Sequence, residues 1–220
     1  MSVNQVFLHG NAAHNKAVSM LTNLGKLIKL SAPSFDIDSS LEMFDLVMQG
    51  FMLKIAIADG DFAKEEIAYI QAICDKADIL ERLNKASKGT LDVSWIGLKF
   101  MNAEHREKIV SILERIVTEL TEKFFVPYAA VDTVLDKNIY EDIKESILTI
   151  LAAFAMIDGD SDNFSEHIAI VQILKVLETA WNKANDRING YDHSDKGHVE
   201  RPVPARNSLK ARYEMLKKTD

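Results

Sequence analysis

Cysteine, proline and glycine are scarce in this chain of 220 residues, which has one, four and nine of them. The single cysteine, Cys74, excludes an internal disulfide and any metal site built from several cysteines. The scarcity of proline and glycine, beside abundant Leu, Ile, Ala, Lys and Glu, favours helix over strand. Because apolar residues make up 47% of the chain, we expect a globular protein with a substantial core.

Long apolar runs are also missing. The longest, Ile147 to Ile157, is interrupted by Thr149 and is too short to span a membrane, so no membrane insertion is expected. The first ten residues lack the basic and apolar regions of a signal peptide, and a cytoplasmic location is the default expectation.

Positive charge is in deficit, with 26 Lys and Arg against 33 Asp and Glu and a net charge of −7. Residues 189–220 contain seven basic and five acidic side chains (+2), so residues 1–188 carry −9. An acidic body argues against nucleic acid as a partner, because nucleic acid binds basic surfaces.

Motifs for enzymes and organic cofactors are absent as well. The chain has no Gly-x-Gly pair, no Gly-x-x-x-x-Gly-Lys, no Gly-x-Ser-x-Gly and no Glu-x-x-His. Dinucleotide-binding, phosphate-cradling, nucleophile-elbow and di-iron patterns are therefore excluded. We expect no organic cofactor and assign no catalytic residue.

One pattern is present twice. Residues 55–61 form an apolar run that ends in Asp-Gly-Asp, and residues 154–160 repeat this arrangement 99 positions later. Apolar residues at helical spacing precede each copy, and a glutamate that suits the first turn of a new helix follows it. The repeat predicts two helical hairpins, at about 41–77 and 140–178, with the acidic turns at equivalent places.

Each predicted turn concentrates carboxylates. The candidate metal ligands are Asp59, Asp61 and Glu66 in the first turn, and Asp158, Asp160, Asp162 and Glu166 in the second. Such acids repel one another unless water, a cation or a basic side chain intervenes. Oxygen ligands favour Ca²⁺ or Mg²⁺ over Zn²⁺, so a divalent cation is the predicted ligand. The alternative is that these acids serve only as helix caps.

The second turn is longer than the first by one residue. Its Asp-x-Asp-x-Asp opening is similar to an EF-hand loop, but the sixth and twelfth positions are Asn163 and Ala169, so a regular EF-hand is rejected. The glutamate equivalent to Glu166 in the first copy is either Glu65 or Glu66. Aligning the apolar residues that follow gives Glu65, whereas the helical spacing of the apolar face favours Glu66.

The other distinctive side chains have structural interpretations. His167 is more simply a surface residue than a ligand, and Cys74 is interpreted as a buried apolar residue without a reactive role. Trp95 and Trp181 are expected to anchor the core or an interface.

A similar pattern occurs twice in the chain: a helix, then Ala-x-Ala-Asp-Gly, then a nearby Glu that opens a second helix. This doubled pattern resembles the tellurite-resistance TerB-like family. The first copy, Ile55 to Glu66, fits well, and the second fits from Phe154 to Asp160 before its turn lengthens. The resemblance implies an all-α bundle in which two helical hairpins are related by a pseudo-twofold axis. It also implies an acidic cluster that binds divalent metal, at the matching positions Asp59, Glu66, Asp158 and Glu166. It also implies a role in stress or metal-related complexes.

Hydrophobic spacing predicts an all-α bundle of about seven to nine helices, in one domain over residues 1–188. Residues 1–11 are expected to be loose, Pro127 to end a helix, and 91–101 to be a short buried helix or an extended connector. The predicted helices are 12–30, 36–58, 63–77, 80–87, 102–125, 131–136, 139–157 and 164–188. The apolar face of the last helix is expected to consist of Ile168, Val171, Leu174, Val176 and Leu177. Residues 189–220 are predicted to be a polar tail, partly helical or disordered.

The predicted function is a non-enzymatic acidic module that binds a divalent cation, a protein partner or a second copy of itself. Two alternatives stay open. One is a metal-dependent hydrolase using the same acidic turns. The other is a purely structural interaction domain whose acids are helix caps.

Overall fold

The computed structural model describes residues 2–59, 62–74, 77–135, 138–157 and 164–189. Within these ranges the chain forms eight helices and no strand, which confirms the predicted all-α bundle. The helices are α1 (Val3–Ser31), α2 (Ile37–Asp59), α3 (Lys64–Ile73), α4 (Ile79–Ser87), α5 (Trp95–Lys99), α6 (Ala103–Leu135), α7 (Ile139–Phe154) and α8 (Phe164–Asn189). No helix in the described ranges is both long enough and apolar enough to cross a membrane.

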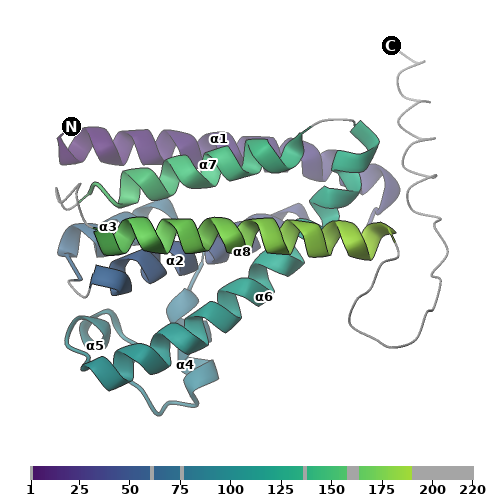
Figure 1. The fold of residues 1–220 in the computed structure, drawn as a ribbon. Helices are drawn as coiled ribbons and strands as arrows, with labels where there is room; N and C mark the ends of the chain where they lie inside the picture. The colour runs from purple at the N-terminus through teal and green to yellow at the C-terminus, as the bar shows by residue number, and fades with distance from the viewer. Residues whose placement is uncertain (1, 60–61, 75–76, 136–137, 158–163, 190–220) are drawn as a thin grey trace.

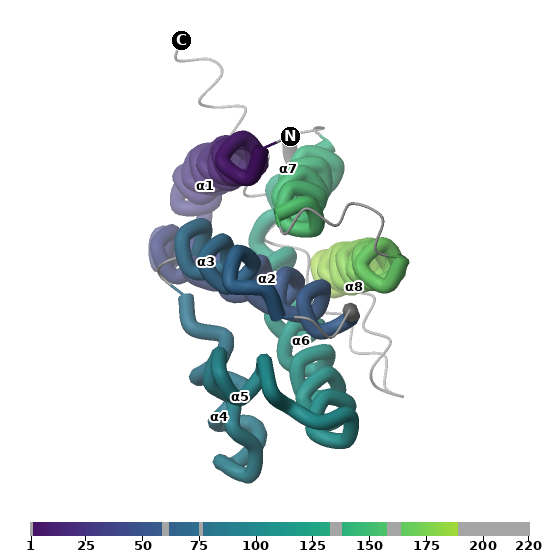
Figure 2. The backbone as a smooth tube through the Cα atoms, turned by 90° about the vertical axis from the view of Figure 1, so that its left-hand side faces the viewer, coloured from purple at the N-terminus to yellow at the C-terminus, as the bar shows by residue number. Residues whose placement is uncertain are grey.

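The helices are arranged around α2. Helix α1 packs along α7 at one edge of the bundle, and the long α6 packs against both α2 and α8 (Figure 1). Helices α4 and α5 lie at the opposite edge from α1 and α7 (Figure 2). Helix α2 ends, and α8 begins, at the same end of the bundle, on the left in Figure 1. The segments that flank the two acidic turns therefore share one end of the molecule.

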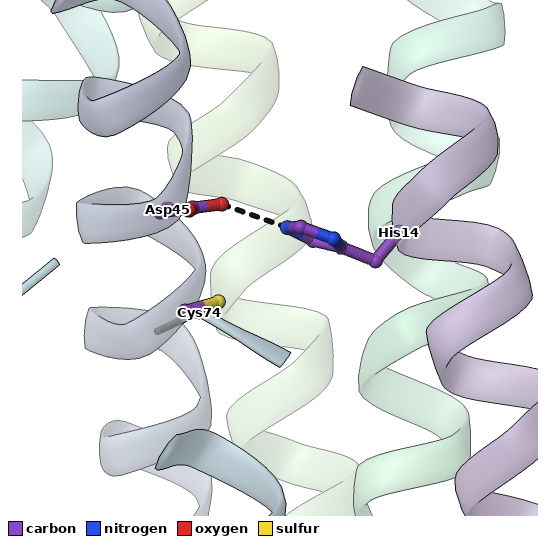
Figure 3. A group of neighbouring side chains, drawn as sticks. All are labelled: His14, Asp45 and Cys74. Atoms are coloured by element: carbon purple, nitrogen blue, oxygen red, sulfur yellow. Dashed lines mark hydrogen bonds and ion pairs between the residues drawn. The ribbon is translucent and has the colours of Figure 1, made fainter. Parts of the chain in front are cut away.

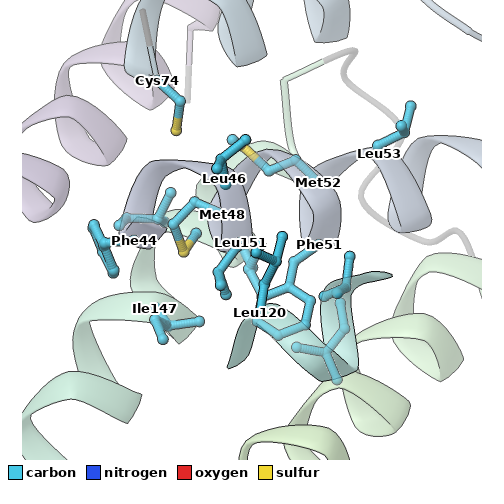
Figure 4. Packing of buried hydrophobic residues seen from close by; sticks show 14 of the residues in the cluster. Phe44, Leu46, Met48, Phe51, Met52, Leu53, Cys74, Leu120, Ile147 and Leu151 are labelled. Carbon is cyan, nitrogen blue, oxygen red and sulfur yellow. The ribbon is translucent and has the colours of Figure 1, made fainter. Parts of the chain in front are cut away.

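Helix α2 is buried on almost every side. Its second half reads Phe51-Met-Leu-Lys-Ile-Ala-Ile, and within it only Lys54 is less than fully buried. A helix that is apolar all round belongs in the interior, which is where α2 lies. Its side chains gather with Leu120 of α6 and with Ile147 and Leu151 of α7 (Figure 4).

Two boundary predictions were wrong. Residues 3–11 are helical, because Ser2 caps α1: the Gln5 N–H donates to Ser2 Oγ, and the Ser2 N–H donates to Gln5 Oε1 over 3.0 Å. Pro127 lies inside α6, which continues to Leu135, so the segments predicted as separate helices at 102–125 and 131–136 belong to one helix. Phe125 and Tyr128, on either side of the proline, are fully buried, and this packing offsets the lost backbone hydrogen bond.

The buried face of α8 also differs from the prediction. The apolar residues Ile168 and Val171 were expected to face inward, yet they are 43% and 53% exposed. The inward face combines three alanines with three large apolar residues, and of the predicted face it keeps Leu177. The buried residues of this face are Ala169, Ile173, Leu177, Ala180, Trp181 and Ala184.

Residues 91–101, predicted to be a short buried helix or an extended connector, contain the short helix α5. Ser94 caps this helix, because its Oγ accepts from the Gly97 N–H over 3.0 Å. Leu98 is buried, whereas Ile96 and Phe100 are largely exposed. The predicted tail lies outside the described residues from 190 onward, so the division into a domain and a tail stays a prediction.

Candidate functional site

The first acidic turn is entered from the buried helix α2, whose last residue is Asp59. Phe62 anchors the exit from the turn, because its side chain is buried and its ring centroid lies 6.3 Å from that of Trp95. Ala63 then takes an extended backbone conformation and α3 begins at Lys64. Both flanks of the turn are therefore fixed in the core.

Glu66 is the third residue of α3, and it is only 1% exposed. Its Oε2 accepts a hydrogen bond of 2.9 Å from the Ala63 N–H, which is one half of a capping box. Ala63 has no side-chain acceptor to supply the other half. Glu65 points to the surface, where its carboxylate lies 3.7 Å from the Lys64 ammonium. The burial of Glu66 rather than Glu65 agrees with pairing Glu66 and Glu166.

The second turn is entered from α7 through a tight turn, in which the Ile157 N–H donates to the Phe154 carbonyl over 3.0 Å. Ile157 is buried, as Phe62 is on the other hairpin. Helix α8 begins at Phe164, so Glu166 is again the third residue of its helix, and it is 3% exposed. Its neighbours Ser165 and His167 are exposed, as expected for His167.

The structure thus places two of the seven predicted metal ligands, Glu66 and Glu166. Both are buried, and both occupy the third position of the second helix of a hairpin. The side chain of Asp59 lies outside the described part of the chain, as do the residues Asp61, Asp158, Asp160 and Asp162. The predicted cation sites formed by these residues stay a prediction.

A groove of about 640 Å³ runs along α1 and α7. His9, Glu141 and Glu145 are among its lining residues, but Glu66, Glu166 and His167 are not. Within the described residues this groove therefore does not bring His9 to Glu66 or Glu166, and the hydrolase alternative stays a prediction.

A group of possible metal ligands that sequence reasoning missed lies in the core. His14 of α1, Asp45 of α2 and Cys74 at the end of α3 are all buried, and one ligand atom of each lies within 4.8 Å of the other two. The His14 Nε2 is 2.7 Å from Asp45 Oδ1. The burial of Cys74 confirms that part of its interpretation, and the structure adds His14 and Asp45 as its neighbours. His14 and Asp45 are 31 positions apart, so no local spacing could have indicated the group.

Comparison with models of known protein families, with curated proteins and with solved structures found no match to this chain. The resemblance to the TerB-like family therefore stays a prediction.

Proposed function

We propose that this chain is a non-enzymatic helical module that binds a divalent cation at its two acidic turns. The observation that carries the proposal is the equivalent burial of Glu66 and Glu166, each in the first turn of a helix that follows an Asp-Gly-Asp sequence. A helix cap does not require burial, because the capping box of Ser2 and Gln5 forms at exposed residues.

Burial of a glutamate requires compensation. Glutamate is rarely fully buried unless it is paired, since removal of a charge from water is costly. The positive end of the helix dipole and the hydrogen bond from Ala63 supply part of this compensation to Glu66. A cation shared with the aspartates that precede each helix would stabilise both carboxylates further. Carboxylate oxygens favour Ca²⁺ or Mg²⁺.

The role of such a module in stress or metal-related complexes, similar to the TerB-like family, is part of the same proposal. In that role the cation would order the acidic end of the bundle for a protein partner or for a second copy of the chain.

A second candidate function has its own observation. Phe164, Ile168 and Val171 form an exposed apolar stripe on α8, at 75%, 43% and 53% exposure, directly after the second acidic turn. If Glu66 and Glu166 act only as caps, this stripe makes the chain a helical interaction domain without a metal. The experiment below separates the two functions.

The experiment is thermal unfolding with Ca²⁺ or Mg²⁺ against a chelator, with Na⁺ at matched ionic strength. Binding to the folded state alone stabilises it by about 2.7 kcal/mol at a hundredfold excess over Kd, or roughly 5–10 °C for a chain of this size. The variant Glu66→Gln/Glu166→Gln should lose this rise. The matched control Glu65→Gln/Glu178→Gln, which changes two surface carboxylates, should keep it. Equal melting points with and without cation in the wild type would refute cation binding and leave the interaction domain.

A further inference from the structure

We propose that His14, Asp45 and Cys74 form a second metal site, buried in the core and selective for Zn²⁺. It differs from the acidic turns in place, in ligand chemistry and in the metal it takes. Figure 3 shows the three side chains converging from separate segments, with the His14 ring directed at the Asp45 carboxylate and the Cys74 sulfur lying beside it.

The ligand set matches zinc. One sulfur, one imidazole nitrogen and one carboxylate oxygen are the three ligand types of protein zinc sites, whereas Ca²⁺ and Mg²⁺ take oxygen almost alone. Tetrahedral zinc holds such atoms about 3.3–3.7 Å apart, given bond lengths of about 2.0–2.3 Å. The three atoms already lie within 4.8 Å of one another. The His14–Asp45 contact at 2.7 Å has only to open by a fraction of an ångström to admit the ion.

Charge also favours zinc at this position. A Zn²⁺ ion with one thiolate, one carboxylate and one neutral imidazole has a net charge of zero. Neutrality matters here because the three residues are 8%, 5% and 0% exposed, and an unbalanced charge in such surroundings costs several kcal/mol. Three protein ligands leave the fourth tetrahedral position to a water molecule.

The surrounding residues hold the ligands in place. Gln49, one turn after Asp45 on α2, donates from Nε2 to the carbonyls of Cys74 and Ala77, both over 2.8 Å. Its Oε1 accepts from the Ile79 N–H over 2.9 Å, which fixes the exit of α3 against α2. On the other side, the His14 ring stacks on Phe44 with centroids 5.7 Å apart. This orientation is built by packing and does not depend on the metal.

The experiment is titration of the full-length, metal-free protein with Co²⁺ and Zn²⁺. Cobalt at this site should give the near-ultraviolet charge-transfer band of a cobalt–thiolate bond, at one equivalent per chain, and Zn²⁺ should displace it. Since Cys74 is the only cysteine, this band reports on one atom. Zinc should also protect Cys74 from a thiol reagent.

The variant Cys74→Ala should lose the band and bind Zn²⁺ at least about a hundredfold more weakly, because even loss of a residue that only supports a ligand costs 10–100-fold. The control His105→Gln removes an exposed histidine of α6 and should bind as the wild type does. A cobalt complex without the thiolate band, no bound metal, or equal Zn²⁺ affinity in Cys74→Ala and wild type would each overturn the proposal.

The two metal proposals fail separately. The variant Glu66→Gln/Glu166→Gln should keep the cobalt–thiolate band, and Cys74→Ala should keep any stabilisation by Ca²⁺ or Mg²⁺.

Discussion

A Cβ atom added to Gly10 of α1 would lie 1.6 Å from the hydroxyl oxygen of Tyr69 on α3. The tyrosine has no room to withdraw, because it is fully buried and its hydroxyl donates to the Ile150 carbonyl over 3.3 Å. Phe7 and Phe154 also contact its ring, with centroids 5.5 and 5.6 Å away. The absent side chain at Gly10 therefore lets α1, α3 and α7 meet around one tyrosine.

Gly10→Ala should destabilise the fold even though alanine is the better helix former. The helical preference gains about 1 kcal/mol. Overpacking costs about 1–3 kcal/mol, and a contact of 1.6 Å against a confined ring belongs at or beyond the upper end. We expect a net loss of roughly 2 kcal/mol by urea unfolding. Ala12→Gly, at an exposed position of the same helix, measures the propensity term alone. A Gly10→Ala protein more stable than wild type would show that Tyr69 moves aside.

Gln49→Ala should loosen the end of α3. The substitution leaves the Cys74 and Ala77 carbonyls and the Ile79 N–H without the side chain that now bonds them, and an unsatisfied buried polar group costs about 1–3 kcal/mol. We expect a total loss of roughly 3 kcal/mol and faster reaction of Cys74 with a thiol reagent. Gln71→Ala, an exposed position on α3, should change neither quantity. Unchanged thiol reactivity in Gln49→Ala would mean that Cys74 is held by its other contacts.

Tyr128→Phe tests a buried hydroxyl and its pH dependence. The Tyr128 hydroxyl lies 2.8 Å from Ser40 Oγ, and burial raises the tyrosine pKa from its ordinary 10 to about 12. Because the pKa is higher in the folded state, the contribution of protonated Tyr128 to the free energy of unfolding is complete below pH 10. It is lost as the pH rises through about 12. A two-unit shift corresponds to about 2.7 kcal/mol over the whole interval.

The measurement is the free energy of unfolding at about pH 9 and about pH 11. Near pH 9 the phenylalanine variant should be about 1–2 kcal/mol less stable than wild type, because Ser40 loses its partner. Between the two pH values wild type should lose about 1 kcal/mol more than the variant does. Parallel losses in both proteins would assign the alkaline sensitivity to other groups, among them Tyr69 and Tyr140, whose pKa values burial also raises.

Much of the helical fold could be predicted because helix formation is encoded locally. Apolar spacing and caps indicated the segments that became α2, α3, α4, α7 and α8. The capping box of Ser2 and Gln5 was also a local signal, as was the helical spacing of Val3, Val6 and Phe7, but the prediction of loose residues 1–11 used neither. Pro127 misled for a different reason: a local rule predicted a break, but the buried aromatic residues on both sides of the proline hold α6 together.

The candidate sites also differ in whether the local sequence encodes them. Glu66 and Glu166 belong to a repeated local pattern, so the sequence could indicate both and favour their pairing. His14, Asp45 and Cys74 come from three helical segments, and only the packing of α1 and α3 on α2 brings them together. No spacing rule within one segment can predict such a group.

The face of α8 supplies the last prediction, because periodicity alone did not distinguish its buried from its exposed side. Ile168 and Val171 were expected in the core, but the structure exposes them and buries Ile173 completely. Ile168→Lys/Val171→Lys should therefore change the free energy of unfolding by no more than about 1 kcal/mol, as surface substitutions stay within about 0.5 kcal/mol each. Ile173→Ala should cost about 2–5 kcal/mol. The measurement is chemical unfolding of the three proteins, accompanied by sedimentation of the wild type and the double lysine variant. A second outcome is that the lysine variant loses much of its free energy of unfolding only at a concentration where wild type is a dimer. That result would show that a second copy covers the stripe. A large loss in the monomer would show that α8 is rotated from the orientation described here.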